Sequence, residues 1–108
     1  MSDAWYDIII MPSANDRMSE HFEFLAQVSE AAASRLVERL ISDIDSLHYH
    51  PHRCPSYDRP FTHIGKYRYL MSSKRYRIVY MVEGNKVFID DIQDCRQDID
   101  DTILFLDE

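Results

Sequence analysis

Basic side chains gather in one stretch of an otherwise acidic chain, and their chemistry suits the binding of phosphates or of an acidic partner segment. Residues 53–77 hold seven bases against one acid, Asp58, whereas acids outnumber bases before and after this stretch. We expect either a cationic patch or an ordinary solvated loop and strand face, depending on whether these side chains converge in space. The bases are Arg53, Arg59, Lys66, Arg68, Lys74, Arg75 and Arg77.

Two motifs in this stretch show the alternation that is typical of β-strands: GKYR at 65–68 and YRIVY at 76–80. Successive side chains of a strand point to opposite faces of the sheet, so Arg77 shares a face with Val79 and lies opposite Tyr76. The motifs combine cationic and aromatic groups and therefore predict a binding surface. Beside the arginines, its candidate residues are Lys66, Tyr67, Tyr76 and Tyr80.

The guanidinium of Arg77 stands in the middle of its predicted strand. It has to reach solvent, a ligand or a carboxylate, because an unpaired buried guanidinium is energetically costly. Asp90 and Asp91 lie on the strand that follows and are the candidate partners for a structural ion pair. The sequence leaves the binding role and the ion pair as alternatives.

The first half of the chain predicts a strand and two helices. An Ile-rich strand over 6–11 stops at Pro12, and Ser13 and Ser29 are suitable N-caps for two consecutive helices. Apolar residues recur every three or four positions in each helix, which indicates one buried face per helix. These residues are Ala14, Met18, Phe22, Leu25 and Val28, and then Ala33, Leu36, Val37, Leu40, Ile41, Ile44 and Leu47.

The second half of the chain predicts a β-meander. After an irregular connection over 48–64, the apolar period changes to two, and strands are expected over 66–71, 75–82 and 86–92. The order β-α-α-β-β-β predicts an α+β fold. In this fold the N-terminal helix hairpin packs on a small antiparallel sheet.

Length and composition indicate a single globular domain, residues 1–108, in which residues 99–108 form either a tail or a short element. The net charge of −7 argues against a protein that coats itself with nucleic acid. The N-terminal residues lack a basic segment and a long apolar run, so we expect no signal peptide, no membrane span and a cytoplasmic location. Cys54 and Cys95 suit unpaired thiols in a reducing compartment.

Histidines alternate with other residues near the middle of the chain, where they could supply metal ligands. The run consists of His48, His50, His52 and Cys54, with His63 downstream. Its spacing matches no recognised zinc motif, and prolines interrupt it. We therefore expect a solvated loop there, with no metal, and no cofactor in the protein.

The order of elements and several short motifs resemble the RelE/ParE superfamily of type II toxin–antitoxin systems. The likeness covers roughly residues 5–98 and implies a toxin that is held by a cognate antitoxin. RelE-like members cleave messenger RNA on the ribosome, whereas ParE-like members inhibit DNA gyrase without cleaving anything themselves. The motifs are Tyr67-Arg68, Tyr76-Arg77-x-x-Tyr80 and Arg96-Gln97-Asp98.

RNA cleavage by a ribose 2′-hydroxyl needs a base, an acid and cations that hold the phosphate charge. In RelE-like enzymes these roles fall to two lysines, two arginines and a tyrosine. Arginine is a poor general base and leucine cannot act as one, so the likeness implies a partial phosphate clamp with incomplete acid–base groups, unless His63 or Tyr67 substitutes. The matching positions are Arg68 and Leu70 for the lysines, Arg77 and Arg96 for the arginines, and Thr102 for the tyrosine.

The resemblance therefore favours a ParE-like toxin that binds DNA gyrase. Arg68, Arg77 and Arg96 are expected to gather on the exposed side of the meander and contact a phosphate or the target. The alternatives are a metal-independent, RelE-like messenger RNA endonuclease that acts on the ribosome, and an inactive member that retains only partner binding. The acidic net charge departs from the usual basic toxin, so we expect apolar burial to dominate antitoxin binding. Whether the chain forms a homodimer stays open.

Overall fold

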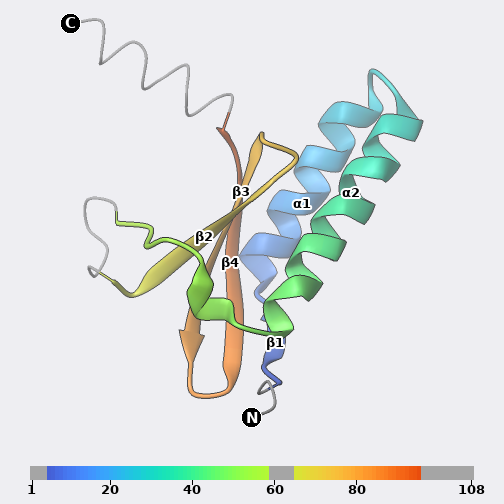
Figure 1. The fold of residues 1–108 in the computed structure, drawn as a ribbon. Helices are drawn as coiled ribbons and strands as arrows, with labels where there is room; N and C mark the ends of the chain where they lie inside the picture. The colour runs from blue at the N-terminus through green and yellow to red at the C-terminus, as the bar shows by residue number, and fades with distance from the viewer. Residues whose placement is uncertain (1–4, 59–64, 96–108) are drawn as a thin grey trace, which may run out of the picture.

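Two helices pack on one face of a four-stranded sheet (Figure 1). The computed structural model describes residues 5–58 and 65–95. The order β-α-α-β-β-β and the α+β class are confirmed. The elements are β1 (Asp7–Ile10), α1 (Pro12–Ala26), α2 (Glu30–Asp45), the 3-10 helices η1 (Ser46–His48) and η2 (Pro51–Arg53), β2 (Tyr67–Ser72), β3 (Tyr76–Glu83) and β4 (Lys86–Asp94).

The first helix begins one residue earlier than its predicted cap. Met11 is the N-cap and Pro12 is the first helical residue, where its missing N–H costs nothing. Ser13 therefore lies inside the helix, and its hydroxyl donates to the backbone oxygen of Asp90 at 2.9 Å. The prediction of Ser13 as the cap was wrong, but this serine ties α1 to β4.

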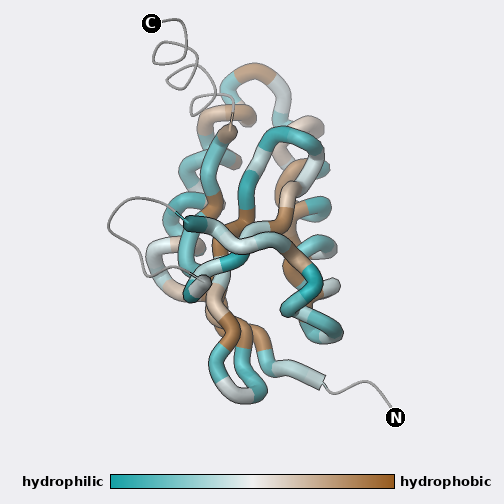
Figure 2. Tube along the Cα trace, turned by 60° about the vertical axis from the view of Figure 1, so that its left-hand side comes forward, coloured by the Kyte–Doolittle hydropathy of each residue, from teal (hydrophilic) through white to brown (hydrophobic). Residues whose placement is uncertain are grey.

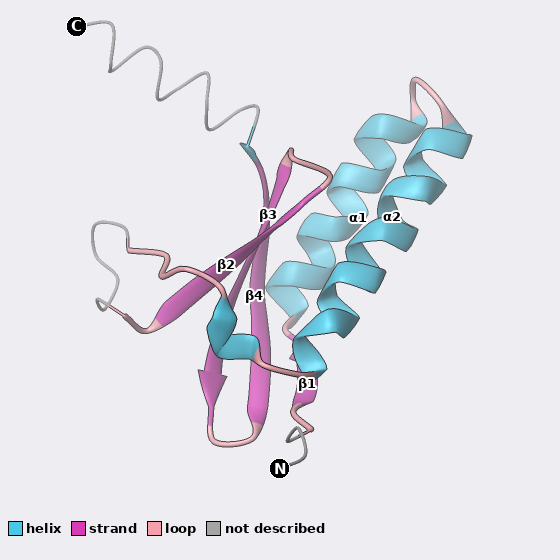
Figure 3. Cartoon of the chain, in the orientation of Figure 1, coloured by secondary structure: helices cyan, strands magenta, loops and turns pink. Residues whose placement is uncertain are grey.

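The second helix begins as predicted, because the Ser29 hydroxyl accepts a hydrogen bond from the Ala32 N–H at 3.1 Å. Its buried face is narrower than the predicted one: Ile41 is 44% exposed, whereas Leu40 is fully buried. Val28 is 82% exposed, because it lies in the connection between the helices rather than on the apolar face of α1. Figure 3 shows the two helices running side by side along their length.

The strand order is β1-β4-β3-β2, and the meander β2–β3–β4 is antiparallel as predicted. The first strand differs from the expectation of an antiparallel sheet, because β1 pairs parallel with β4 and the sheet is therefore mixed. Backbone hydrogen bonds fix this edge at both ends, from Asp7 to Asn85 and from Met11 to Ile89, each 2.9 Å long.

Both hairpin turns use left-handed backbone conformations. The β3–β4 turn has two residues, and Gly84 occupies its first position at φ 61°, which glycine adopts without steric cost. The β2–β3 turn contains Ser73 and Lys74 at φ 56° and 59°, closed by a hydrogen bond from Arg75 N–H to Ser72 O. These turns set which residues of adjacent strands face each other.

The core lies between the helix hairpin and the sheet, with apolar side chains from both layers. Hydrophobic stretches follow the strands, and hydrophobic and hydrophilic residues alternate along the helices (Figure 2). No described helix is long and apolar enough to cross a membrane. The buried residues of this core are Ala14, Leu36, Leu40, Ile44, Leu47, Cys54, Tyr76, Ile78, Tyr80, Val87, Ile89 and Ile92.

Candidate functional site

The sheet has one face covered by α1 and α2 and one face that these helices leave open (Figure 1). The core contacts of Tyr76 and Ile78 assign the even-numbered side of β3 to the helices, so Arg77 points to the open face. Antiparallel pairing sets Arg77 opposite Met71 of β2 and Gln93 of β4. A binding surface that includes Arg77 would therefore lie on the open face.

Two tyrosine rings flank the Arg77 guanidinium on this face. Its central carbon lies 5.4 Å from the centre of the Tyr57 ring and 5.5 Å from that of Tyr69, and the two rings meet edge to face at 6.2 Å. These distances suit cation–π attraction, which holds a guanidinium against aromatic faces. Arg77 also donates to the side-chain oxygen of Gln93 at 2.9 Å. We call Tyr57, Tyr69, Arg77, Asp91 and Gln93 the open-face cluster.

Tyr57 reaches the open face because its loop runs along the outer edge of β2. The Tyr57 N–H donates to Tyr67 O at 2.7 Å, and the Tyr69 N–H donates to Pro55 O at 3.1 Å. Ser56 pairs with Arg68 in an isolated bridge and shares its face, so Tyr57 turns to the opposite one. The irregular connection thus pairs briefly with the outer edge of β2 and places the Tyr57 ring on the open face.

A polar chain continues from the cluster toward the first helix. Gln93 lies within hydrogen-bonding distance of the Tyr57 hydroxyl, and its side-chain nitrogen donates to the Asp91 carboxylate at 3.2 Å. Asp91 in turn lies 3.6 Å from the guanidinium of Arg17 on α1. The predicted ion pair of Arg77 with Asp90 or Asp91 is thus not formed in the described part of the chain, because Gln93 lies directly opposite Arg77.

A shallow cleft of about 130 Å³ opens beside the cluster. Aromatic, amide and carboxylate groups line it, and Tyr67 contributes from the candidate residues of the sequence. Lys66 is exposed in the turn just before β2, with its ammonium 5.4 Å from the centre of the Tyr67 ring. The lining residues are Tyr57, Tyr67, Val79, Asp90, Asp91 and Gln93.

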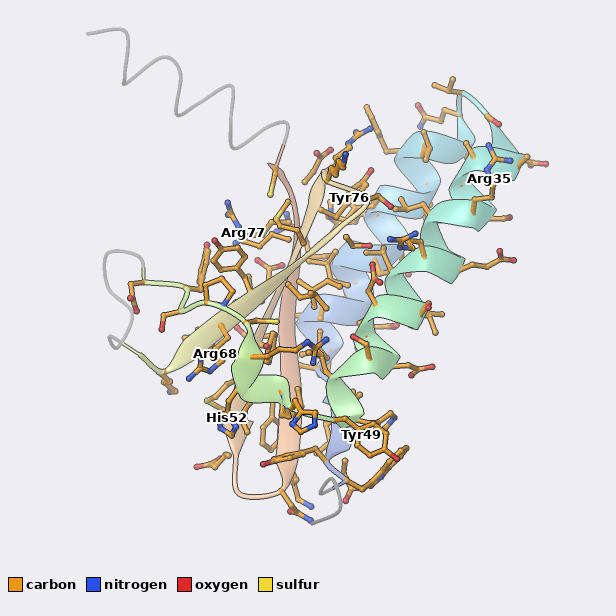
Figure 4. All side chains as sticks on the ribbon, viewed as in Figure 1. Arg35, Tyr49, His52, Arg68, Tyr76 and Arg77 are labelled. Atoms are coloured by element: carbon orange, nitrogen blue, oxygen red, sulfur yellow. The ribbon has the colours of Figure 1, made fainter. Side chains whose placement is uncertain are left out.

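Arg68 lies on the other side of the sheet from Arg77, which corrects the expectation that they gather on one exposed surface. Arg68 pairs with Tyr80, whose ring is buried under the helices. The Arg68 guanidinium donates to Cys54 O at 2.6 Å, so it fastens the connection to the sheet (Figure 4). Arg96 and Thr102 lie outside the described residues.

Tyr76 and Tyr80 are core residues, 3% and 0% exposed. The Tyr80 hydroxyl donates to Pro51 O at 2.6 Å, and burial, with a further contribution from Cys54, raises the pKa of Tyr80 well above its ordinary value. The Tyr80 ring is fully buried, whereas the narrow exposed edge of Tyr76 lines a groove beside α2. Full burial contradicts the predicted binding role of Tyr80 and assigns this residue to packing, whereas the binding role of Tyr76 stays a prediction.

The histidine run borders the core rather than converging on one point. The His48 ring contacts Tyr6 O at 2.7 Å and stacks on Trp5 with ring centres 3.8 Å apart, while Cys54 is buried. Within residues 5–58 and 65–95 no three histidine, cysteine, aspartate or glutamate side chains are arranged to hold a metal ion. His63 lies outside these ranges.

Sequence reasoning missed Tyr57, Tyr69 and Gln93. Tyr69 could have been found, since it alternates with Tyr67 along the same strand. Gln93 follows from the pairing register, which requires the length of the β3–β4 turn and a bulge between Val79 and Tyr80. Tyr57 stands in an irregular connection and carries no periodic signal.

The comparisons with known proteins agree with this fold. Residues 8–99 match the family model of the ParE toxin of the type II toxin–antitoxin system parDE. A solved structure described as the chromosomal ParDE toxin–antitoxin system from P. aeruginosa superposes with a TM-score of 0.68 at 13% identity, over 84% of this chain and 97% of that one. No curated protein matches the sequence. The family model covers most of the chain, which therefore belongs to the ParE toxins of type II toxin–antitoxin systems.

Proposed function

We propose that this toxin inhibits bacterial growth by binding DNA gyrase in the cytoplasm, that it does not cleave RNA, and that a cognate antitoxin holds it inactive. The proposal extends to this chain the pairing of toxin and antitoxin named for its family and its structural neighbour. Our candidate for the toxin surface that contacts gyrase is the open-face cluster.

The observation that supports binding over cleavage is the direction of two β2 side chains. Arg68 and Leu70, which match the lysines of RelE-like nucleases, pair with Tyr80 and Ile78 and share their helix-covered face. A general base on that face could not reach a phosphate held by Arg77 on the other. The β2 residues on the same face as Arg77 are Tyr67, Tyr69 and Met71.

The composition of the open face also suits a protein partner. Arginine and tyrosine are over-represented among the residues that dominate the energy of protein interfaces. In the open-face cluster, tyrosine rings hold the Arg77 guanidinium in place, so little side-chain entropy remains to be lost on binding. We therefore assign Arg77 a contact with the target rather than a catalytic step.

A supercoiling assay with purified gyrase and purified toxin tests the proposal directly. We expect the toxin to inhibit supercoiling and Arg77→Ala to raise the half-inhibitory concentration about tenfold or more. Lys86→Ala is the matched control, because Lys86 is an exposed base at the start of β4, away from the cluster. Equal loss in both variants would indicate a general charge effect and remove Arg77 from the site.

Induced expression in cells without antitoxin tests the same proposal in vivo. We expect a DNA damage response and gyrase-linked DNA breaks. Codon-specific cuts in messenger RNA would instead support the RelE-like endonuclease, and normal growth would indicate an inactive member. Each of these last two outcomes contradicts the proposal.

A further inference from the structure

A groove separates α2 from the β2–β3 turn, on the helix-covered side of the sheet and away from the open-face cluster. Its volume is about 450 Å³. Leu25, Leu36 and Tyr76 make its walls apolar, and arginines stand at its rim. Figure 4 shows Arg35 on α2 and Tyr76 on β3, the two elements that bound the groove. The rim arginines are Arg35, Arg39 and Arg75.

The rim carries a positive excess even after its internal ion pairs are counted. Arg39 donates to Asp43 at 3.2 Å, and Arg75 forms two hydrogen bonds with Asp94, at 2.9 and 3.1 Å. Arg35 is exposed, and no described residue forms an ion pair with it. The groove therefore suits an occupant that is apolar on one side and acidic on the other.

The last described residues stand at the edge of this groove. The Cys95 N–H donates to Arg75 O at 2.7 Å, and Asp94 pairs with the Arg75 guanidinium. Because Arg75 also lines the groove, the described part of the chain ends at the groove wall. Residues 96–108 lie outside the described part of the chain.

The sequence that continues from this point has the composition that the groove requires. Residues 96–108 hold five acids and one base. Ile99, Ile103 and Leu106 are spaced by four and three positions, the spacing that places side chains on one face of a helix. Residues 103–106 read Ile-Leu-Phe-Leu, an apolar run that is unfavourable when left in water.

We propose that the groove between α2 and the β2–β3 turn is the docking site for residues 98–108 of the same chain. The apolar residues of the segment would lie against Leu25 and the narrow exposed edges of Leu36 and Tyr76. Its carboxylates would face Arg35 and Arg39. Even at the helical rise of about 1.5 Å per residue, the segment reaches about 16 Å, enough to lie along the groove.

Attachment to the groove wall favours this occupant over a free one. A tethered segment acts at an effective concentration on the order of millimolar, which a second copy or a partner segment must exceed in solution. Any acidic partner segment that uses the groove therefore has to displace the toxin's own residues. This inference concerns the groove alone and does not depend on whether gyrase is the target.

Paramagnetic relaxation measured on the full chain tests the proposal. A nitroxide spin label is attached through Asp107→Cys, while the native thiols of Cys54 and Cys95 are 6% and 2% exposed and are protected by burial. We expect the amide signals of Ala32, Arg35 and Ser73 to broaden strongly. Lys86, the first residue of β4, pairs with Glu83 at the far end of β3 and should keep its intensity.

Charge and apolar variants decide whether docking is specific. Arg35→Glu should lower the ratio of docked to undocked segment about fivefold, and adding Asp100→Arg and Asp101→Arg should restore it. Lys86→Glu makes the same charge change outside the groove and should have no effect. Replacing Ile99, Ile103 and Leu106 by serine should abolish the broadening.

Two outcomes overturn the proposal. The first is broadening that is spread evenly, or centred on another surface, in the spin-labelled chain. The second comes from mixing spin-labelled chain without isotope and isotope-labelled chain without spin label. Broadening of the groove signals in that mixture, at the level seen within one chain, would identify a second copy as the occupant.

Discussion

Alternate side chains of β3 lie on two faces of the sheet that differ in role: one face packs against the helices, and the other is our candidate binding surface. On the helix-covered face Tyr76, Ile78 and Tyr80 are buried and contact the helices. On the open face the guanidinium of Arg77 lies between two tyrosine rings of the open-face cluster. Successive residues of β3 alternate between these two faces. A substitution on the helix-covered face should therefore affect stability, and a substitution of Arg77 on the open face should affect binding. Substitutions on the helix-covered face should cost the most in the free energy of unfolding, and those on the open face the least.

Ile78→Ala should have the largest effect, because it opens a cavity where the side chain is fully buried. We expect a loss of about 3 kcal/mol in the free energy of unfolding, measured by urea denaturation. Met71→Ala on the open face is the matched control and should cost less than about 1 kcal/mol, since Met71 is 39% exposed. Equal costs at both positions would contradict the division between the two faces.

Arg75→Met should be the next most costly change, because it leaves the Asp94 carboxylate, which is 7% exposed, without its guanidinium partner. The hydrogen bond from Arg75 to Asp94 raises the pKa of Arg75, so the guanidinium is charged throughout the accessible pH range. We expect a loss of about 2 kcal/mol on urea unfolding. Arg75→Met combined with Asp94→Leu should recover part of it, and purely additive effects in this double-mutant cycle would show that the pair is not coupled.

Tyr80→Phe should cost about 1 kcal/mol at neutral pH, since it removes the buried hydrogen bond to Pro51 O. Burial raises the pKa of Tyr80 in the folded chain above its unfolded value, so folding favours the neutral phenol. This contribution is complete below about pH 10 and is lost as the pH rises further. Urea unfolding at pH 8 and pH 10.5 should therefore show a steeper alkaline loss in the parent than in the variant. Equal slopes would mean that the phenol is accessible to water.

The sequence predicted the helices and strands, but not which face of the sheet each arginine lies on. Apolar periodicity found both helices and all four strands, because burying one face imposes a period of 3.6 or 2. The relative side of Arg68 and Arg77 depends on which residues pair across β2 and β3. Ser72 faces Tyr76 across the turn, so Arg68 faces Tyr80 and cannot share a side with Arg77. A turn that shifted the register by one residue would have placed both arginines on the same face of the sheet.

Other features of the fold and site depend on contacts between distant residues. The parallel pairing of β1 with β4 carries no local signal, since β1 reads as the same apolar run in either direction. The aromatic part of the open-face cluster depends on Tyr57, whose loop is positioned by backbone hydrogen bonds to Tyr67 and Tyr69. Local patterns could therefore predict Arg77 as a candidate but not the rings that hold it.

Arg77→Ala should have the smallest cost to folding of the four and a large effect on activity. Its contacts with Tyr57, Tyr69 and Gln93 lie on the open face, outside the core between helices and sheet, so we expect a loss of about 1 kcal/mol or less in urea unfolding. The growth inhibition caused by the toxin should fall because the guanidinium is removed from the proposed target surface. Arg77→Lys should retain the charge but lose the planar stacking, and we expect an intermediate effect.

The outcome of this last pair of variants separates the two roles that the sequence left open for Arg77. Reduced toxicity with a loss of no more than about 1 kcal/mol in urea unfolding would support a contact with the target. Loss of folding, measured by circular dichroism, would identify the residue as a structural partner of Gln93 and the two tyrosines. Undiminished toxicity in a folded Arg77→Ala variant would remove the open-face cluster from the target surface. The division of β3 would then be one between a packed face and a merely solvated one.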